Sequence, residues 1–504
     1  MADMDDSRTD LPLIRQARAH GSQVGVIDKN VHSYADLLDA SARVATALLQ
    51  GRLDLREARI TFIIPPGFEY VAVQWGIWRA GGIAVPLALS HPPAEWAYVL
   101  DDTGAEAVVT ASEYGEPLTP VASTRGVPII DAADLLREAH PSQLPSVDPS
   151  RRAMIVYTSG TTGHPKGAVT THDNIQAQVT SLLEAWEWSK DDRILLVLPL
   201  HHVHGIINVL TCALWAGATC EMSPSFDAES VWERIASGQL TLFMAVPTIY
   251  RRLITAWETM SPQQRQRIGT GSRRLRLMVS GSAALPVDTL EAWRSITGHV
   301  LLERYGMTEI GMALSNALHG ERRPGTVGTK LPGVDVRLVE NGTEVPHGTP
   351  GEIEVRGPSV FLEYWQRPEE TRAAFRNDWF RTGDVAVLED GAYRILGRTN
   401  VDIIKTGGYK VSALEIEEVL RGHEAIADCS VVGLEDPDWG ERVGVLVELA
   451  DQCDLGLEAL KEWARDRLAP YKLPRVLGTT GTLPRNAMGK VIKSQVVEIL
   501  QTQG

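Results

Sequence analysis

One segment of the sequence combines glycine, hydroxyl and lysine residues in an arrangement that suits the binding of a polyphosphate. It runs from Tyr157 to Gly167, reads Tyr-Thr-Ser-Gly-Thr-Thr-Gly-His-Pro-Lys-Gly, and follows an apolar run at 154–156. Glycine lets backbone N–H groups turn towards an anion, the hydroxyl groups add donors, and Lys166 supplies positive charge. Because glycine follows this lysine, the spacing differs from that of the G-x-x-x-x-G-K-[ST] loop. A flexible Ser/Thr/Gly surface loop is the alternative interpretation.

Five later segments form an ordered pattern with this loop over most of the chain. They are Tyr305–Glu309, Arg381–Asp384, Gly397–Arg398, Lys405–Val411 and Pro484–Lys490. Together the six segments resemble the signature motifs of the adenylate-forming superfamily, which includes acyl-CoA synthetases, peptide-synthetase adenylation domains and beetle luciferases. Six matches in the family's order make chance a poor explanation. The resemblance implies an α/β fold, with a large N-terminal domain of parallel αβ sheets, a β-barrel-like subdomain and a small mobile α+β C-terminal domain.

The resemblance also implies which residues bind the triphosphate of ATP and catalyse its reaction with a carboxylate. The catalytic residues would be Lys490, Thr308 and Glu309. A mobile lysine suits this step, because attack of a carboxylate on the α-phosphorus joins two anions. Glu309 and Thr162 would hold Mg²⁺, which prefers carboxylate and phosphate oxygens. The residues of the phosphate loop would be Thr158, Ser159, Gly160, Thr161, Thr162, Gly163 and Lys166.

By the same resemblance, a second group of residues would bind adenine and ribose. Asp384 would accept hydrogen bonds from both ribose hydroxyls as an ionised carboxylate, with Arg398 beside it. Tyr305 would stack on adenine, and the small residues 281–283 would let the flat base lie against the backbone. The alternatives are an ordinary turn aspartate and a plain strand-to-helix turn. The full set is Gly281, Ser282, Ala283, Glu303, Tyr305, Gly306, Asp384 and Arg398.

Residues 199–205, Pro-Leu-His-His-Val-His-Gly, place three histidines within four positions. A zinc site is disfavoured, because no cysteine or second histidine pair with ligand spacing accompanies them. In the family this position begins a helix that borders the acyl pocket. His202 and His204 are therefore candidate pocket residues, with packing histidines as the alternative. Arg304 and Met307 complete the predicted acyl pocket.

Arg304 indicates the chemistry of the acid. It stands where many relatives carry a small residue, which places a guanidinium against the inner wall of the acyl pocket. A buried arginine needs an anionic partner, and the second carboxylate of a dicarboxylic acid would pair with it bidentately. Segments 279–285 and 301–312 also resemble the malonyl-CoA synthetase branch. We therefore predict malonate as the substrate and methylmalonate as a second one. The alternative is that Arg304 pairs with Glu303 or another internal acid.

The resemblance implies a reaction in two halves. A carboxylate first attacks ATP to give an acyl-adenylate and pyrophosphate, and the thiol of CoA then displaces AMP. The small domain rotates between the halves, which removes the catalytic lysine and brings another loop to the thiol. The residues of this CoA-side loop would be Lys405, Gly407 and Gly408.

The expected domains are a large ATP- and acyl-binding domain, residues 1–397, and a small C-terminal domain, residues 398–504. A chain of 504 residues exceeds the size at which a single core stops growing. The segment 398–405 is one residue longer than the common family pattern. The hinge residue is therefore either Asn400 or Asp402.

Rival functions remain open. The acid could be another small carboxylic acid, or the adenylation enzyme could load a separate carrier protein instead of CoA. A luciferase-like oxygenase does not suit a charged pocket wall. From a different class, the chain could be a non-catalytic nucleotide-binding scaffold, although a scaffold would need none of the ionisable residues of the motifs. These are Lys166, Glu309, Asp384, Arg398 and Lys490.

Composition narrows the class further. A formal net charge of −15 argues against general affinity for nucleic acid or anionic membrane. Four scattered cysteines indicate neither a disulfide framework nor a metal site. No apolar run approaches a membrane span, and the acidic N-terminus differs from a presequence, so we expect a cytoplasmic protein unless a transit peptide has been removed. The sequence does not indicate an oligomeric state.

Hydrophobic periodicity predicts alternating strands and helices in the first part of the chain, which indicates a parallel sheet. Short strands between 325 and 397, with a hairpin turn at Asn341-Gly342, indicate the barrel-like subdomain. The expected helices are 34–49, 71–80, 174–188, 414–420 and 457–468, and the expected strands are 60–64, 83–87, 193–198, 242–246, 427–434 and 443–449.

Overall fold

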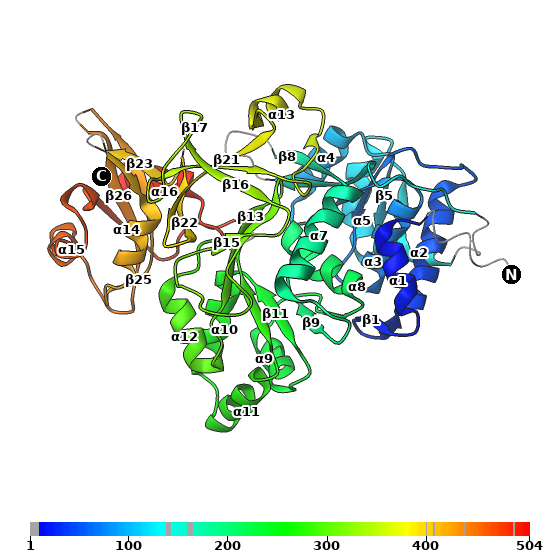
Figure 1. Ribbon diagram of the computed structural model, residues 1–504, viewed down its shortest axis with the longest axis horizontal. Coiled ribbons are helices and arrows are strands. Elements are labelled where there is room, and N and C mark those ends of the chain that lie inside the picture. Colours follow the sequence, from blue (N-terminus) through cyan, green and yellow to red (C-terminus); the bar gives the residue numbers. More distant parts are fainter. Residues whose placement is uncertain are drawn as a thin grey trace.

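The structure is a computed structural model, and it describes residues 10–137, 143–158, 165–399, 401–406, 409–437, 439–486 and 489–503. Figure 1 shows helices α1 and α2 towards one end of the long axis and helices α14 and α15 towards the other. Several predicted site residues lie outside the described residues: Ser159, Gly160, Thr161, Thr162, Gly163, Asn400, Gly407 and Gly408.

A seven-stranded sheet carries the phosphate loop. Its order is β19-β8-β7-β4-β3-β5-β6. The strands from β7 to β6 in this order are parallel, whereas β7 and β8 are antiparallel and flank the loop in the sequence. The parallel part confirms the strand–helix–strand prediction. The strands are β3 Arg59–Ile63, β4 Ile83–Pro86, β5 Ala107–Thr110, β6 Ile129–Asp131, β7 Arg152–Thr158, β8 Lys166–Thr171 and β19 Glu363–Tyr364.

A nine-stranded sheet carries the residues predicted for the nucleoside and the acid. Its order is β15-β14-β13-β12-β11-β9-β10-β1-β2, with a parallel centre from β13 to β1 and antiparallel pairs at both edges. The strands are β1 Val24–Ile27, β2 Val31–Ser33, β9 Arg193–Leu196, β10 Thr219–Met222, β11 Leu242–Ala245, β12 Leu277–Ser280, β13 Leu302–Met307, β14 Gly311–Ser315 and β15 Thr329–Lys330.

Helices cover these two sheets (Figure 1). Helix α2 has the bounds that its periodicity predicted, because Ser33 and Asp36 form a reciprocal capping box at its start. The helices before residue 300 are α1 Pro12–His20, α2 Tyr34–Leu49, α3 Phe68–Arg79, α4 Pro93–Thr103, α5 Ser112–Ser123, α6 Ala132–Leu136, α7 His172–Trp186, the π-helix η2 His204–Thr211, α8 Cys212–Ala216, α9 Ala228–Ala236, α10 Pro247–Glu258, α11 Pro262–Ser272 and α12 Val287–Thr297.

The predicted barrel-like subdomain is a six-stranded antiparallel sheet with the order β17-β16-β18-β21-β20, in which β22 pairs with β21. Asn341 and Gly342 both have positive φ, 52° and 82°, as a two-residue hairpin turn requires. The elements are β16 Asp335–Glu340, β17 Thr343–Glu344, β18 Gly351–Arg356, α13 Pro368–Ala374, β20 Phe375–Arg376, β21 Trp379–Glu389 and β22 Ala392–Arg398.

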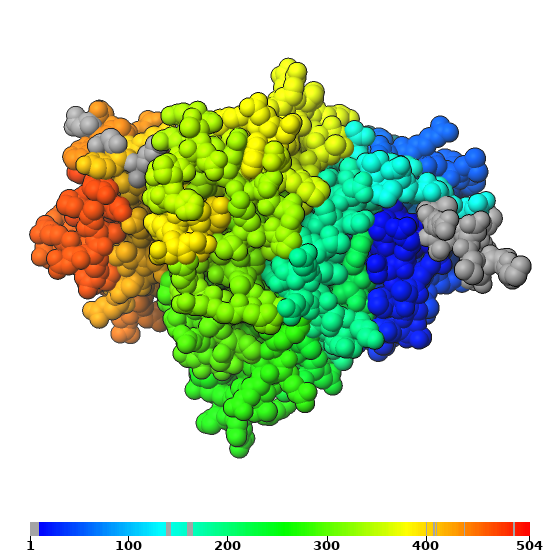
Figure 2. Space-filling view, viewed as in Figure 1, coloured from blue at the N-terminus to red at the C-terminus, as the bar shows by residue number. Residues whose placement is uncertain are grey.

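The C-terminal residues form a lobe with its own sheet and its own buried clusters, seen in orange and red in Figure 2. The sheet order is β24-β23-β26-β25, with β27 parallel to β26. The part of the chain that the structure describes has no helix long and apolar enough to span a bilayer. The elements are β23 Ile403–Thr406, β24 Tyr409–Ser412, α14 Ala413–Leu420, β25 Ile426–Asp436, β26 Gly440–Leu449, α15 Leu457–Ala464, η3 Pro470–Lys472, β27 Val476–Thr480 and α16 Lys493–Gln503.

Candidate active site

Asp384 is the centre of one corner of the site. Strands β21 and β22 pair so that Asp384 lies opposite Arg398, whose Nε donates to Asp384 Oδ1 at 3.0 Å. The Tyr305 hydroxyl, from β13, donates to Asp384 Oδ2 at 2.6 Å. Burial raises the pKa of Asp384, although Arg398 and Tyr305 act in the opposite direction. The structure therefore brings together three residues that the sequence predicted for the nucleoside.

Glu309 lies just beyond the end of β13, and its carboxylate is buried. The hydroxyl of Tyr364, on β19, donates to Glu309 Oε1 at 2.9 Å, and burial raises the pKa of Glu309. Lys166 Nζ lies 5.3 Å from the centre of the Tyr364 ring and forms an ion pair with Glu370 of α13. Lys166, on β8, and Glu309, in the turn between β13 and β14, thus meet through Tyr364.

The donor set around Glu309 suits an ion that arrives with its substrate. Among the described residues there is no group of three or more His, Cys, Asp or Glu side chains that could hold a metal. Mg²⁺ is typically bound by one or two carboxylates together with phosphate oxygens and water. A single buried carboxylate with one hydrogen-bonded oxygen fits this mode, and Thr162, the other predicted ligand, lies outside the described residues.

The turn after β12 contains the small residues predicted to face the adenine. Ser282 has φ 70°, in the left-handed region that costs a non-glycine residue free energy. Its hydroxyl lies 3.2 Å from Nδ1 of His204 and 3.4 Å from Nη2 of Arg304. Gly281 lies directly against the guanidinium of Arg304, because a Cβ at this position would lie 2.5 Å from Arg304 Cζ and would displace that group. Ala283 follows on the same turn.

Arg304 is buried, with 3% of its surface exposed, and its Nε has no hydrogen-bond partner among the described residues. The alternative partner suggested by the sequence is wrong, because Glu303 instead accepts from the N–H of Leu285 at 3.3 Å. Successive residues of a strand point to opposite faces, which explains why the two side chains separate. Burial without a counter-charge lowers the pKa of Arg304 to about 9.

Of the three histidines of the 199–205 segment, His204 is buried and His201 and His202 are half-buried. Loss of solvent contact lowers the pKa of His201 to about 2 and that of His202 to about 4, and burial together with the charge of Arg304 lowers the pKa of His204 well below its usual value, so all three are neutral. The Nε2 atoms of all three have no hydrogen-bond partner among the residues described. His204 begins the π-helix η2, and its Nδ1 contacts the Ser282 hydroxyl beside Arg304, while its role as a pocket residue stays a prediction.

Residues 306–308 link Tyr305 to Glu309. Gly306 is needed for packing, because a Cβ there would lie 2.1 Å from the carbonyl oxygen of Gly311. Met307 is half-buried and packs against the main core, and Thr308 is half-buried in the turn that follows β13. In the sequence, Met307 and Thr308 therefore lie between Tyr305, which contacts Asp384, and Glu309.

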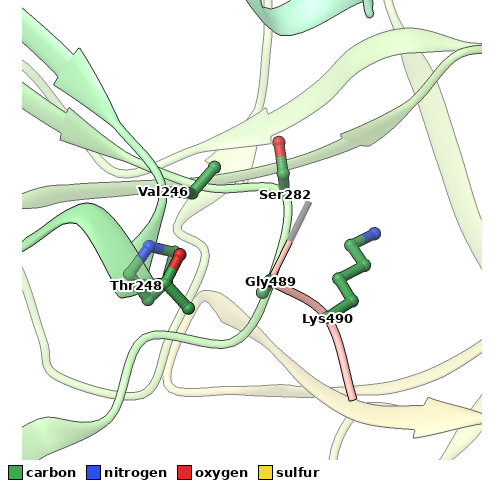
Figure 3. A pocket seen from close by; sticks show the side chains of 7 residues that line it. Val246, Thr248, Ser282, Gly489 and Lys490 are labelled. Carbon is green, nitrogen blue, oxygen red and sulfur yellow. The ribbon is translucent and has the colours of Figure 1, made fainter. Parts of the chain in front are cut away.

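Lys490 closes the site from the C-terminal lobe (Figure 3). Gly489 and Lys490 lie against the 246–248 and 282–283 segments around a cavity of about 20 Å³, enough for one water molecule. Lys490 is an exposed residue. Partial desolvation lowers the pKa of Lys490, and the charges of Arg398 and Arg304 lower it further, whereas Asp384 raises it.

Sequence reasoning missed two residues that the structure places in the site, Tyr364 and Glu370. Neither lies in one of the six motifs, and each contacts its partner only through the tertiary fold. Lys405 lies elsewhere, exposed on β23, where its N–H donates to Glu441 at 2.5 Å. Thr158 ends strand β7 at the entrance to the phosphate loop, half-buried.

Two family domains match this sequence. The AMP-binding enzyme family covers residues 13–365, and the AMP-binding enzyme C-terminal domain covers residues 415–490. The chain belongs to the AMP-binding enzyme family. This confirms the resemblance to adenylate-forming enzymes and, with it, an AMP-forming type of ligase chemistry.

Individual relatives and structures agree with this assignment. The chain is 48% identical to the protein named malonate–CoA ligase ACSF3, mitochondrial, of Mus musculus, with 98% of this chain and 91% of the relative covered. It is 47% identical to the protein of the same name in Homo sapiens, with 96% and 91% covered. ATP-bound MatB from Rhodopseudomonas palustris superposes with a TM-score of 0.89 at 31% identity, covering 97% of this chain and 98% of MatB.

Proposed function

We propose that this protein is an ATP-dependent malonate–CoA ligase that forms malonyl-CoA through a malonyl-adenylate. The observation that carries the proposal is the buried Arg304 guanidinium, which has no acidic partner among the described residues and lies beside Ser282 and the neutral His204. Leaving a buried charge unpaired is costly, so a site of this kind is built for an anion that arrives with the substrate. The relatives named malonate–CoA ligases support the same acid.

The second carboxylate of malonate binds Arg304 in this proposal. A guanidinium binds a carboxylate through two parallel N–H···O bonds, and the Ser282 hydroxyl adds a third donor. His204 stays neutral, so its ring shapes the pocket without adding charge. Analogues that lack the second carboxylate would leave the guanidinium unpaired, which gives strong discrimination against them. Methylmalonate keeps both carboxylates and is the expected second substrate.

The first half-reaction takes place at the other carboxylate. One of its oxygens attacks the α-phosphorus of ATP, the bond from that phosphorus to the bridging oxygen breaks, and pyrophosphate leaves. Lys490 lies within the electrostatic reach of Asp384, Arg398 and Arg304, so its ammonium offsets the charge that develops between the two anions. Asp384, with Tyr305 and Arg398, would hold the ribose, and the small 281–283 turn would face the adenine.

Lys166 and the loop before it would bind the β- and γ-phosphates. Glu309, with Thr162, would hold Mg²⁺, which neutralises phosphate charge when it is bound. Thr308 lies between Tyr305 and Glu309 in the sequence, and its hydroxyl would donate a hydrogen bond to the α-phosphate. Each of these roles is a proposal that extends the contacts described above.

The second half-reaction uses CoA as the co-substrate. Its sulfur attacks the acyl carbon of malonyl-adenylate, the bond to the phosphate oxygen breaks, AMP leaves and the thiol proton passes to solvent. We propose two domains, residues 1–397 and 398–504, whose relative rotation removes Lys490 and brings Lys405, Gly407 and Gly408 to the thiol. Because Lys405 lies apart from the Arg304 site, the two halves need different arrangements of the lobe.

The cellular setting is a separate question. The sequence predicted a cytoplasmic protein without nucleic-acid or membrane partners, and that stays a prediction. The two vertebrate relatives are both named as mitochondrial, which conflicts with it in part.

The test is AMP release with ATP, Mg²⁺ and CoA across acetate, butyrate, malonate, methylmalonate and succinate. We expect malonate to exceed butyrate by more than tenfold. Activity led by butyrate would keep the ligase and overturn malonate. Release that needs a carrier protein in place of CoA would favour the carrier-loading enzyme, and no turnover with any acid would favour the scaffold.

A further inference from the structure

The backbone on both sides of Lys490 is held by the two residues that begin its loop. Arg485 Nη1 donates to the carbonyl oxygen of Gly489 at 2.7 Å, and Arg485 also pairs with Val491 through a β-bridge. The Asn486 side-chain oxygen accepts from the N–H of Lys490 at 3.0 Å, and the Asn486 N–H donates to the Lys490 carbonyl at 2.9 Å. Residues 485, 486, 489 and 490 therefore form a fixed base for the Lys490 side chain.

Gly489 lets this base approach the large domain. It has φ 78°, and a Cβ at this position would lie 3.1 Å from the side chain of Thr248 at the start of α10. Figure 3 shows Gly489 beside Thr248, with the Lys490 side chain directed away from it. A small movement of the Gly489 carbonyl would therefore move Lys490 relative to Ser282 and Arg304.

A carboxylate holds Arg485 in place. Arg485 Nη2 donates to Asp428 Oδ2 at 2.5 Å, and the other oxygen of Asp428 accepts from Arg421 Nε at 3.2 Å and from the N–H of Cys429 at 2.8 Å. Asp428 is 14% exposed and Arg485 29% exposed, so the pair is only partly screened by solvent. One oxygen of the Asp428 carboxylate thus holds Arg485, while the other is held by Arg421 and by the Cys429 N–H.

The same network continues to the end of the large domain. Arg421 pairs with Glu417 at 3.4 Å, and Glu417 pairs with Lys493 at 3.1 Å. Lys493 pairs with Asp402 at 2.6 Å, and Asp402 accepts from the N–H of Arg398, the residue that also binds Asp384. A continuous series of ion pairs therefore joins the base of the Lys490 loop to the segment in which the sequence places the hinge.

We propose that Arg485, held by Asp428, is a positioning residue for Lys490 in the adenylation half-reaction. The inference rests on the proposed function, because Lys490 is assigned to that half alone. A lysine has a long flexible side chain, so its charge reaches the reacting phosphate only if the backbone that carries it is fixed. A misplacement of about 1 Å can cost on the order of 10²-fold in rate.

The test separates the two half-reactions in the full-length protein. Adenylation is followed as malonate-dependent exchange of pyrophosphate into ATP without CoA, and thioester formation as AMP release from supplied malonyl-adenylate and CoA. For Arg485→Ala we expect kcat of the exchange to fall by about 10- to 100-fold with little change in the KM of ATP or malonate. The rate from malonyl-adenylate should stay within about twofold of wild type, because that half does not use Lys490.

A matched control removes a similar pair from the same lobe. Glu462, on the exposed surface of α15, forms an ion pair at 3.0 Å with Arg465, the residue after the last turn of that helix. Arg465→Ala deletes the same side chain and the same charge as Arg485→Ala, and we expect it to leave both half-reactions unchanged. In the background of Lys490→Ala, loss of Arg485 should cost no further exchange activity, because the two residues act as one unit.

The outcomes distinguish this inference from the proposed function. If wild-type protein shows no malonate-dependent exchange, the proposed function fails. If wild type is active and Arg485→Ala exchanges at the wild-type rate, or loses both halves equally while folded, the positioning role is overturned. If circular dichroism shows that Arg485→Ala is unfolded, the same two half-reactions are measured in Asp428→Asn, which keeps the shape of the side chain and removes only its charge. The positioning role then stands or falls on whether Asp428→Asn slows the exchange alone.

Discussion

Replacing Arg304 with methionine should separate the cost of this residue to stability from its benefit to activity. Methionine keeps an unbranched side chain of similar reach but removes the guanidinium. Two charge-assisted hydrogen bonds to a second carboxylate are worth about 3–6 kcal/mol, which corresponds to a loss of about 10²–10⁴-fold in kcat/KM for malonate. Butyrate, which has no second carboxylate, should not lose activity in proportion.

The same substitution should not destabilise the protein. The pKa of Arg304 falls to about 9 in the folded state, below its usual value of 12.5. A cation whose pKa is lowered by folding opposes folding at every pH below that lowered value, and the penalty fades as the pH rises from about 9 towards 12.5. Arg304→Met removes this penalty, so thermal unfolding at pH 7 should occur at the wild-type temperature or above.

Arg322 supplies the matched control, because it is a half-buried arginine in which each of the three guanidinium nitrogens donates a hydrogen bond. Its guanidinium donates to the carbonyl oxygens of Ala317, Leu318 and Val300 at 3.1, 2.8 and 2.6 Å. Arg322→Met would leave these carbonyls without their donors, at a cost of about 1–3 kcal/mol, and should lower the unfolding temperature. The assay must be able to resolve changes of about tenfold. If Arg304→Met keeps kcat/KM for malonate within about threefold of wild type, the proposal that Arg304 binds the second carboxylate of malonate is refuted.

Two further substitutions test other charges of the site. Glu370→Gln removes the carboxylate that pairs with Lys166, so the lysine is freer for phosphate, and titration calorimetry should show ATP binding about two- to fivefold tighter. Glu369→Gln, an exposed neighbour on the same helix, is the control, and weaker binding in Glu370→Gln would mean that Glu370 orients the lysine instead. Burial raises the pKa of Glu303 to about 8, so stability is lost as the pH rises from about 4.5 to 8. Glu303→Gln keeps the bond from Leu285, and its unfolding temperature should exceed that of wild type at pH 8 but match it near pH 4; equal values at both would contradict a protonated Glu303.

The elements that sequence patterns located best are those whose ends are set by local chemistry. Helix α2 was predicted with its observed bounds, since its capping box lies within four residues. Helix α3 begins at Phe68, three residues before the apolar run that predicted it, because Gly67 starts the helix without a side-chain cap. The π-helix η2 could not be predicted, because its longer-range backbone bonds leave no distinct pattern of apolar residues.

The residues of the candidate site likewise fall into those that a sequence motif located and those that only the tertiary fold places there. Asp384, Arg398 and Tyr305 belong to motifs, and the pairing of β21 with β22 and the position of β13 bring them together. Tyr364 and Glu370 carry no such signal, because the contact between Tyr364 and Glu309 spans 55 residues and depends on how two sheets meet. Sequence identified the residues that do chemistry, but it could not identify the partners that orient them.

The balance of charge inside the site explains why the composition of the whole chain says little about its substrate. The protein carries a net charge of −15, yet Arg398 and the buried Arg304 lie near enough to Lys490 for both charges to lower its pKa. Long-range repulsion from the acidic surface is screened within about 8 Å at physiological ionic strength, whereas enclosed charges are screened much less. The nearby histidines are neutral because burial and these cations lower their pKa values, so they add no further positive charge. The unpaired Arg304 guanidinium costs stability until an anion enters, and that cost becomes selectivity, because only a ligand that places a negative charge beside Arg304 can relieve it.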